Sequence, residues 1–399
     1  MITRPPLPPA PFLIVGLARS GIAAAYMLAP YGEVIGVDSG EPEVSGFEAH
    51  LNTDGLHLLE RAGTVIKSPG VPQEAPVVQA ARAQGVPVMG ELEVAWRLLP
   101  NKFVAVTGTN GKTTTTELIG AMYRAAGLPV AVAGNVGTPL SSYVGEVTED
   151  TTIVCECSSF QLEDTIEFAP ECAVLLNLEE DHLDRHGTFE AYREAKMRIF
   201  ANQTAADVAV RPPAPRTLDP GQVRLRGPHN VENAEFAAAA ARAMGVPGDA
   251  IAEALRTFAG VPHRLEEVGT VDGVLYVNDS KATNVSAAAR AIESFFAGVH
   301  VILGGSLKGG GFEDLREPIA ERCHACYLIG EAAARLATDL EPAGVPLHRC
   351  GDLDSAVAAA RAAARPGEVV LLSPACASYD QFRDYEERGD RFRALVSAE

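Results

Sequence analysis

Short, continuous apolar runs alternate with longer amphipathic stretches along most of this chain. Strands buried in a parallel sheet are apolar throughout, whereas the helices that cover such a sheet are apolar on one face only. The pattern predicts strands at Pro11–Val15, Glu33–Asp38, Gly63–Lys67, Phe103–Val106, Pro129–Ala133, Thr151–Glu156, Cys172–Asn177, Val274–Asn278, Val299–Leu303, Ala325–Ile329 and Glu368–Leu372. It predicts helices at Ser20–Leu28, from Lys112 onward, and at Thr188–Phe200, Asn230–Met244, Asn284–Phe295, Ala332–Leu340 and Ser355–Ala364. This alternation indicates an α/β fold with parallel strands and right-handed crossovers.

The length of 399 residues exceeds what one hydrophobic core usually serves. We therefore predict three consecutive α/β domains, over residues 1–90, 91–260 and 261–399. The first and third are Rossmann-like, and the central one is like a P-loop ATPase. Residues 211–226 are rich in proline, so we expect a loop there with one short edge strand, and a hinge at Val261–Arg264.

Composition narrows the class of partner. The formal net charge of −19 argues against binding to nucleic acid or to an anionic membrane surface. The proline-rich start has no hydrophobic signal core, and no uncharged apolar run is long enough to span a bilayer. The seven cysteines are odd in number and scattered, so a disulfide framework is not expected. We predict a cytoplasmic, reduced protein.

The strand at Phe103–Val106 leads into a glycine loop, Gly108–Gly111, and then into a helix that opens with Lys112 and Thr113. Backbone N–H groups and the positive end of the helix dipole favour an anion there, the lysine adds charge, and the hydroxyl is a ligand for Mg²⁺. The alternative is an ordinary glycine turn, because the strict G-x-x-x-x-G-K-[ST] spacing fails at Val106. The stretch predicts a phosphate-binding loop.

The first turn, Gly16–Gly21, is a weakened G-x-G-x-x-G motif, and Asp38 follows the next strand. Three interpretations stay open on this segment: an NAD site, a site for the phosphates of a nucleotide-linked substrate that also uses Arg19 and Ser68–Gly70, or a turn that needs small residues for packing.

Acidic side chains follow two strands of the central unit. Glu156 ends one strand, and a carboxylate there could hold Mg²⁺ beside a phosphate; the alternative is a capping or ion-paired acid. Acids surround His182 in the segment Glu179–Arg185, which predicts a second metal site or a solvated loop. Lys196, taken alone, looks like a surface lysine on a helix of mixed polarity.

Three polar loops follow strands of the last unit: Asn278–Asn284, Gly304–Gly311 and Ser373–Ser378. Any one of them could be a packing turn. Because the carboxyl ends of parallel strands meet at one edge of a sheet, three together predict a site for a small carboxylate ligand.

These strings together resemble the Mur ligases, and the last unit is similar to the member of that family that adds D-glutamate. The resemblance covers nearly the whole chain in order and rests on TGTNGKT at Thr107–Thr113, GNVG at Gly134–Gly137, ECSSFQ at Glu156–Gln161, EDHLD at Glu180–Asp184, His263–Arg264, NDSKATN at Asn278–Asn284 and LSPACASYDQF at Leu372–Phe382. The resemblance implies an ATP-dependent ligase, here a monomer, that joins D-glutamate to UDP-N-acetylmuramoyl-L-alanine through an acyl phosphate in peptidoglycan precursor synthesis.

The resemblance also implies roles for individual residues. The catalytic residues would be Lys112, Glu156, His182 and Lys196, with two Mg²⁺ held by Thr113, Glu156, His182 and Lys196 in carbamylated form. ATP would contact Gly108, Thr109, Asn110, Gly111, Lys112, Thr113, Thr114, Asn230, Asn233, Arg264 and Asp279. The UDP-linked substrate would contact Arg19, Ser20, Asp38, Ser39, Ser68, Pro69, Gly70, Asn135 and His182. D-Glutamate would contact Lys281, Thr283, Lys308, Ser378 and Tyr385.

Two alternatives remain. Another Mur or folylpolyglutamate-type ligase would add a different amino acid, although the Asp-Asn-Pro-Arg string of the diamino-acid enzyme is absent. An NAD-dependent oxidoreductase would use Gly16–Gly21 and Asp38, but it would leave Lys112 and Glu156 without a role.

Overall fold

The computed structural model describes residues 2–135, 137–307 and 309–397. It divides into two compact units, one made of the residues up to Leu218 together with Asn233–Arg256, the other of Asp219–Glu232 and the residues from Thr257 onward. Within the described ranges, no helix combines the length and apolar character that crossing a bilayer requires. Each of the seven cysteines is a thiol.

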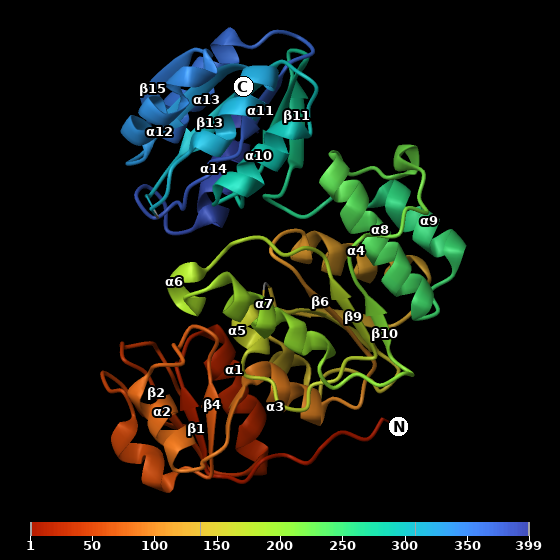
Figure 1. Cartoon of the computed structure of the whole chain (residues 1–399), viewed down its shortest axis with the longest axis vertical. Helices are drawn as coiled ribbons and strands as arrows, with labels where there is room; N and C mark the ends of the chain where they lie inside the picture. Colours follow the sequence, from red (N-terminus) through yellow and green to blue (C-terminus); the bar gives the residue numbers. More distant parts are fainter. Residues whose placement is uncertain (1, 136, 308, 398–399) are drawn as a thin grey trace. The chain divides into compact units, whose positions relative to one another are not determined.

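The first unit contains two five-stranded parallel sheets (Figure 1). The N-terminal sheet has the order β3-β2-β1-β4-β5 and is packed by helices α1 and α2. Its elements are β1 (Phe12–Val15), α1 (Arg19–Leu28), β2 (Val34–Val37), β3 (Glu48–His50), β4 (Thr64–Lys67), α2 (Pro76–Ala83), β5 (Val88–Gly90) and α3 (Glu91–Leu98), with 3₁₀ turns at Ala29–Tyr31 and Leu56–Arg61.

The second sheet has the order β10-β9-β6-β8-β7. Its elements are β6 (Phe103–Thr107), α4 (Lys112–Ala125), β7 (Val130–Gly134), β8 (Thr152–Glu156), α5 (Ser159–Leu162), β9 (Cys172–Leu175), α6 (Leu183–His186), α7 (Phe189–Met197), β10 (Val208–Val210), α8 (Pro228–Ala243) and α9 (Gly248–Thr257), with 3₁₀ turns at Leu140–Tyr143 and Arg198–Phe200. The 3₁₀ turn at Pro220–Gln222 and the residues of α8 up to Glu232 belong to the second unit. Every residue of β6 and β8 is buried, which explains why these strands are apolar almost throughout.

The second unit contains a six-stranded mixed sheet with the order β11-β12-β16-β13-β14-β15, in which only β11 is antiparallel to its neighbour. Its elements are β11 (Glu266–Val271), β12 (Val274–Asn278), α10 (Val285–Glu293), β13 (Val299–Gly304), α11 (Arg316–Arg322), β14 (Cys323–Ile329), α12 (Ala333–Leu340), β15 (Leu347–Gly351), α13 (Leu353–Ala363), β16 (Val369–Leu372) and α14 (Tyr385–Ser397), with 3₁₀ turns at Glu313–Leu315 and Glu341–Ala343.

The α/β fold class is confirmed, and each predicted strand and helix is present within a few residues of its expected bounds. One detail was wrong. The edge strand is β10, which pairs with β9 and ends before the proline-rich residues, because prolines cannot donate to a sheet. Val261–Arg264 forms a turn in the second unit, and its role as a hinge stays a prediction.

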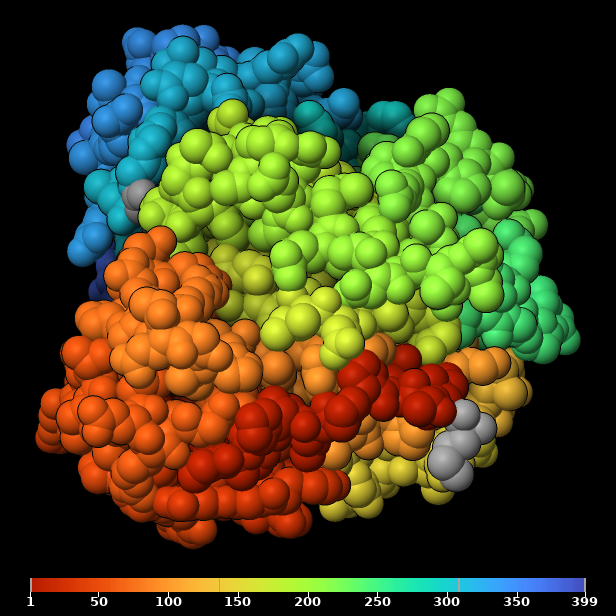
Figure 2. Space-filling model, turned by 60° about the horizontal axis from the view of Figure 1, so that its bottom comes forward, coloured from red at the N-terminus to blue at the C-terminus, as the bar shows by residue number. Residues whose placement is uncertain are grey.

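The two sheets of the first unit share a hydrophobic core. Phe12 and Ile14 of β1 belong to the same buried cluster as Phe103 and Ala105 of β6. The N-terminal arm adds polar contacts: the Arg4 guanidinium donates to the carbonyl of Asn101 at 2.6 Å. Figure 2 shows this arm, in dark red, running over the surface beside the orange and yellow segments. Continuous burial explains why these sheets form one compact unit.

Candidate functional site

The loop after β6 is shaped by glycine. Gly111 has φ +84°, and a Cβ on it would lie 2.2 Å from the Asn233 side-chain oxygen of helix α8. A side chain at this position would therefore both strain the backbone and displace Asn233. Thr114 is buried in the first turn of α4, where the leading N–H groups lie outside the intrahelical ladder. The loop thus presents donors to an anion.

Two lysines converge on this loop. Lys112 Nζ donates to the carbonyls of Gly108 and Thr109 at 2.9 Å each, and Lys196 Nζ donates to the Gly108 carbonyl at 2.8 Å. Lys196 is only 2% exposed. Burial, together with the nearby charge of Lys112, lowers the pKa of the Lys196 ammonium well below its usual range. The structure therefore corrects the first interpretation of Lys196 as a surface residue.

Glu156 lies at the end of β8, next to the start of α4. Its carboxylate accepts hydrogen bonds from the Thr113 hydroxyl at 2.6 Å and from the Asn135 amide at 3.0 Å. Glu156 is 3% exposed, so these oxygens are nearly withdrawn from bulk water. A buried carboxylate beside a hydroxyl is a ligand set that suits Mg²⁺, a hard cation that prefers oxygen.

Two residues that the sequence did not single out support the loop. Asn177 accepts from the N–H of Asn110 through its side chain at 2.9 Å and from the N–H of Thr109 through its carbonyl at 3.1 Å. The Tyr192 hydroxyl lies 3.0 Å from the Thr109 hydroxyl. These bonds engage the main-chain donors of Thr109 and Asn110 and fix the shape of the loop. The sequence did offer one signal for Asn177, because it is the polar residue at the end of an apolar run.

His182 sits in left-handed backbone (φ +53°) at the start of α6. Its ring centroid lies 4.9 Å from that of Phe160, and burial lowers its pKa, so the imidazole is neutral at pH 7. His186 lies one helical turn further along the chain. Its ring stacks on that of Phe160, with the two ring centroids 5.2 Å apart, and its Nε2 lies 3.0 Å from the Ser159 hydroxyl. A neutral imidazole is a competent metal ligand.

Most residues predicted for the UDP-linked substrate follow β1, β2 and β4 of the N-terminal sheet, whereas Asn135 follows β7 and His182 lies between β9 and α6. The Ser68 hydroxyl donates to the Gly16 carbonyl at 2.6 Å, which ties the loop containing Pro69 and Gly70 to the first turn. Ser20 lies in the first turn of α1 and Ser39 is exposed after β2.

Asp38 joins the turn after β1 to its own loop after β2. Its carboxylate accepts from the N–H groups of Leu17 at 2.6 Å and Gly40 at 2.8 Å. These two hydrogen bonds fix the geometry of both turns.

The N-terminal and central parts of the first unit also touch through two arginines. Arg19 donates to the Gly137 carbonyl at 3.2 Å. Arg185, from α6, donates to the carbonyls of Gly70 at 3.1 Å and Pro69 at 3.3 Å. Arg185 was not predicted, because nothing local in the sequence distinguishes it from a solvated charge.

In the second unit, Asp279 follows β12 and lies buried. Its carboxyl group accepts from the Ser373 hydroxyl at 2.8 Å, after β16, and from the Leu265 N–H at 3.2 Å. Burial raises the pKa of Asp279 to about 7, even though both hydrogen bonds oppose that rise. The carboxyl therefore changes charge near neutral pH.

Arg388, on α14, contacts the loops at the same edge of the six-stranded sheet and was not predicted. It is 1% exposed and donates to the carbonyls of Ser280 at 2.8 Å, Cys376 at 3.1 Å and Ala377 at 3.2 Å. Burial lowers its pKa to about 10. One guanidinium thus joins the loops after β12 and β16. No local pattern marked Arg388, which stands in a highly charged helix.

The remaining predicted residues are placed as follows. Lys281 Nζ lies 3.7 Å from the ring centroid of Tyr385, and the Thr283 N–H donates to the Lys281 carbonyl at 2.8 Å. Ser378 is buried, and its carbonyl accepts from the Phe382 N–H at 2.8 Å. Asn230, Arg264 and Asp279 belong to the second unit, whereas Asn233 belongs to the first. Lys308 lies outside the described residues.

The fold and these loops define a class. Residues 106–213 match the model of the Mur ligase middle domain, and residues 263–376 match that of the Mur ligase glutamate ligase domain. The chain belongs to the Mur ligase family. It is 42% identical to the UDP-N-acetylmuramoylalanine–D-glutamate ligase of Acidobacterium capsulatum, with 97% of this chain and 96% of that protein covered. The ligase of the same name from Solibacter usitatus is 41% identical, with 96% and 97% covered.

Solved structures agree on the fold. The UDP-N-acetylmuramate-alanine ligase of Thermotoga maritima superposes with a TM-score of 0.60 at 17% identity, with 97% of this chain and 99% of that chain covered. The MurF ligase of the same organism, solved in complex with ADP, gives a TM-score of 0.58 at 17% identity, with 91% and 95% covered.

Proposed function

We propose that this chain adds D-glutamate to UDP-N-acetylmuramoyl-L-alanine, with ATP as the energy source, in the synthesis of peptidoglycan precursors. The chain is an enzyme, an ATP-dependent amide ligase. The observation that supports the proposal most is the clustering of Lys112, Glu156 and Lys196 about one glycine loop, in a chain similar throughout to D-glutamate ligases.

Amide formation from a carboxylate needs activation of a poor electrophile. In the proposed reaction, the alanyl carboxylate of the nucleotide substrate attacks the γ-phosphate of ATP, which gives an acyl phosphate and ADP. The amine of D-glutamate then attacks the acyl carbon, and phosphate leaves with the former carboxylate oxygen. Lys112 and the N–H groups that open α4 stabilise the negative charge that moves onto the transferred phosphoryl group. Gly108–Thr114 would hold the phosphates.

The ligand set about Glu156 fits Mg²⁺, whose role when bound is to neutralise phosphate charge. Thr113 and Glu156 would hold one ion, and His182 with Lys196 a second. Lys196 is an amine rather than an oxygen ligand, but its lowered pKa favours the neutral form. A neutral amine adds to CO₂ and releases one proton, and the resulting carbamate is an anion with two oxygens. The burial of Lys196 against Gly108 supports this modification.

We assign the remaining residues by the loops they occupy. Arg19, Ser20, Asp38, Ser39, Ser68, Pro69, Gly70 and Asn135 would place the UDP-linked substrate, and Asn230, Asn233, Arg264 and Asp279 would contact the nucleoside part of ATP. Lys281, Thr283, Lys308, Ser378 and Tyr385 would bind D-glutamate. Residues 1–90, 91–260 and 261–399 would be the three functional domains of a cytoplasmic monomer.

The decisive experiment measures phosphate release from ATP in the presence of UDP-N-acetylmuramoyl-L-alanine and one amino acid at a time. D-Glutamate should support release, whereas L-glutamate, L-alanine and diaminopimelate should not. Release with another amino acid and none with D-glutamate would move the chain to a different ligase of the same family. Omission of Mg²⁺, with EDTA present, should abolish release and tests the metal assignment separately.

A further inference from the structure

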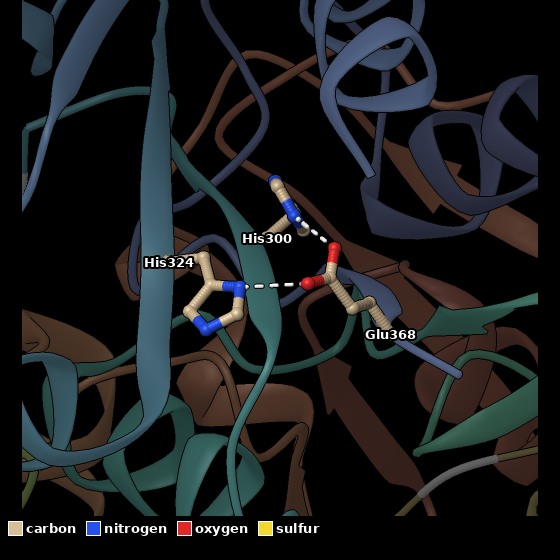
Figure 3. A group of neighbouring side chains, drawn as sticks. All are labelled: His300, His324 and Glu368. Carbon is tan, nitrogen blue, oxygen red and sulfur yellow. Dashed lines mark hydrogen bonds and ion pairs between the residues drawn. The ribbon is translucent and has the colours of Figure 1, made fainter. Parts of the chain in front are cut away.

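A cluster of two histidines and a glutamate lies in the second unit, outside the proposed ligation site. His300 is the second residue of β13, His324 the second of β14, and Glu368 directly precedes β16 (Figure 3). The loops proposed to bind substrate follow the opposite ends of these strands. From His300 to Gly304, four residues of strand span about 13 Å, so the cluster lies at the other edge of the sheet.

The Glu368 carboxylate lies between the two imidazoles. Glu368 Oε2 lies 3.0 Å from His300 Nε2, and Glu368 Oε1 lies 2.9 Å from His324 Nδ1, as the dashed lines in Figure 3 show. One ligand atom from each residue lies within 4.8 Å of the other two. Among the described residues, no other group of three or more histidine, cysteine, aspartate or glutamate side chains brings its ligand atoms this close together.

Local structure directs His324 toward the cluster. In the pairing of β13 with β14, Val299 faces Cys323 and the next pair is His300 with Ala325, so the register skips His324. Such an irregularity turns the extra residue out of the regular alternation of a strand. His324 is thereby brought to Glu368, although the two residues are far apart in sequence.

We propose that His300, His324 and Glu368 form a zinc site, with His300 Nε2, His324 Nδ1 and a Glu368 oxygen as ligands and water in the fourth position. Two imidazoles and a carboxylate suit Zn²⁺ and disfavour Mg²⁺, which prefers oxygen alone. Each imidazole nitrogen lies about 3 Å from a different Glu368 oxygen, and one ligand atom from each residue lies within 4.8 Å of the other two. A small rotation of these side chains would therefore bring all three to metal–ligand distances of about 2.0–2.1 Å.

The surroundings support ligation at these atoms. His300 Nδ1 lies 3.0 Å from the Tyr327 hydroxyl, which can accept the proton that Nδ1 carries when Nε2 binds a metal. The Arg365 N–H donates to Glu368 at 2.8 Å and fixes the carboxylate. The side chains of His300 and Glu368 are 5% and 16% exposed, whereas that of His324 is 55% exposed, so an ion can enter from solvent.

Zn²⁺ would take the place of the direct contacts that His300 Nε2 and His324 Nδ1 now make with Glu368, and each imidazole would carry its proton on the other ring nitrogen. The ion would join β13, β14 and the start of β16 and so stabilise the second unit. The site differs in place and in ligands from the proposed Mg²⁺ sites, so its failure would leave the ligase assignment intact.

The test is calorimetric titration of the full-length protein with ZnCl₂ in excess MgCl₂, together with the thermal midpoint with and without Zn²⁺. The variants are His324→Ala, which changes an exposed side chain, and Glu368→Gln. The matched control is His348→Ala, on the neighbouring strand β15, where another exposed histidine stacks on Tyr327 at 5.2 Å but lies outside the cluster.

We expect wild type and His348→Ala to bind Zn²⁺ with equal affinity and to gain thermal stability. His324→Ala and Glu368→Gln should bind Zn²⁺ at least about tenfold more weakly. Loss of a residue that only hydrogen-bonds to a metal ligand already lowers the affinity by a factor of about 10–100, and these two residues are ligands themselves. His324→Ala should keep its ligase activity, which shows that it is folded. Absence of Zn²⁺ binding in wild type, or equal binding in His324→Ala, would overturn the proposal.

Discussion

Two buried cations, Lys196 in the first unit and Arg388 in the second, occupy similar surroundings and are used differently. Lys196 is 2% exposed and Arg388 is 1% exposed, and both donate to main-chain carbonyls of loops at the carboxyl edge of a sheet. Both also stand on helices that begin at a capping side chain, Thr188 for α7 and Asp384 for α14.

The difference lies in the two functional groups. Burial lowers the pKa of Lys196 well below its usual range, so this side chain can lose its proton and become a nucleophile. Burial lowers the pKa of Arg388 only to about 10, so the guanidinium keeps its charge at neutral pH and uses its fixed fork of donors to hold several loops. A buried lysine is thus suited to chemistry, and a buried arginine to positioning.

The largest expected effect is on activity at Lys196. Lys196→Ala should lower kcat by a factor of about 10²–10³, because charge stabilisation at the reacting phosphoryl group is lost. A short carboxylate such as acetate should restore part of the rate by replacing the carbamate. Lys196→Arg should also be impaired, but acetate should not rescue it, since the guanidinium still fills the space. Full activity in Lys196→Ala would remove the carbamate assignment.

Arg388→Lys should lower the free energy of unfolding by about 3 kcal/mol, because several hydrogen bonds to a charged group are lost and buried carbonyls stay unsatisfied. The KM for D-glutamate should rise more than kcat falls, since the loops that Arg388 joins are those proposed to hold the amino acid. Arg391→Lys is the matched control, because Arg391 lies on the same helix and pairs with Asp354 at the surface. Urea unfolding measures the stability of both variants, and steady-state kinetics measures their KM and kcat. Equal losses of stability and of D-glutamate affinity in Arg388→Lys and Arg391→Lys would contradict the positioning role of Arg388.

Asp279 should make the stability of the second unit depend on pH. Burial raises its folded-state pKa to about 7, above the value of an unfolded aspartate. The folded state therefore binds the extra proton, and stability falls as pH rises from about 4 to 7. Asp279→Asn should gain about 2–3 kcal/mol relative to wild type between pH 5 and pH 8, as measured by urea unfolding. Asp272→Asn, in an exposed turn, should show the same dependence of unfolding free energy on pH as wild type. If Asp279→Asn also shows the wild-type pH dependence, the raised pKa of Asp279 is refuted.

The smallest effects concern the caps of the two helices. The Thr188 hydroxyl accepts from the Ala191 N–H at 3.2 Å, and Asp384 accepts from the Glu387 N–H at 2.8 Å. Thr188→Ala and Asp384→Ala should each cost about 1 kcal/mol in thermal unfolding. Thr188→Ser and Asp384→Asn keep an acceptor and should cost less, and an equal cost would mean that the lost hydrogen bond is not the cause.

Local sequence was sufficient to predict the glycine loop between β6 and α4. Strand, glycines, Lys112 and Thr113 are contiguous, so spacing alone placed them at a strand end and a helix start. Glu156 and Asp279 were found in the same way, because each ends or follows an apolar strand. Lys196 was recognised only through the family resemblance, and Asn177, Arg185 and Arg388 were missed, since their partners are distant in sequence.

The sequence by itself determined the α/β fold, the order of the strands along the chain and the loops at their carboxyl ends, because hydrophobic periodicity and glycine preferences act over a few residues. The tertiary structure decided which charges are buried, since burial depends on what packs from elsewhere. Lys196 and Arg388 look like surface residues on charged helices until the fold encloses them. Desolvation then sets their pKa values, and the same cause gives each of them a role that its neighbours in sequence do not share.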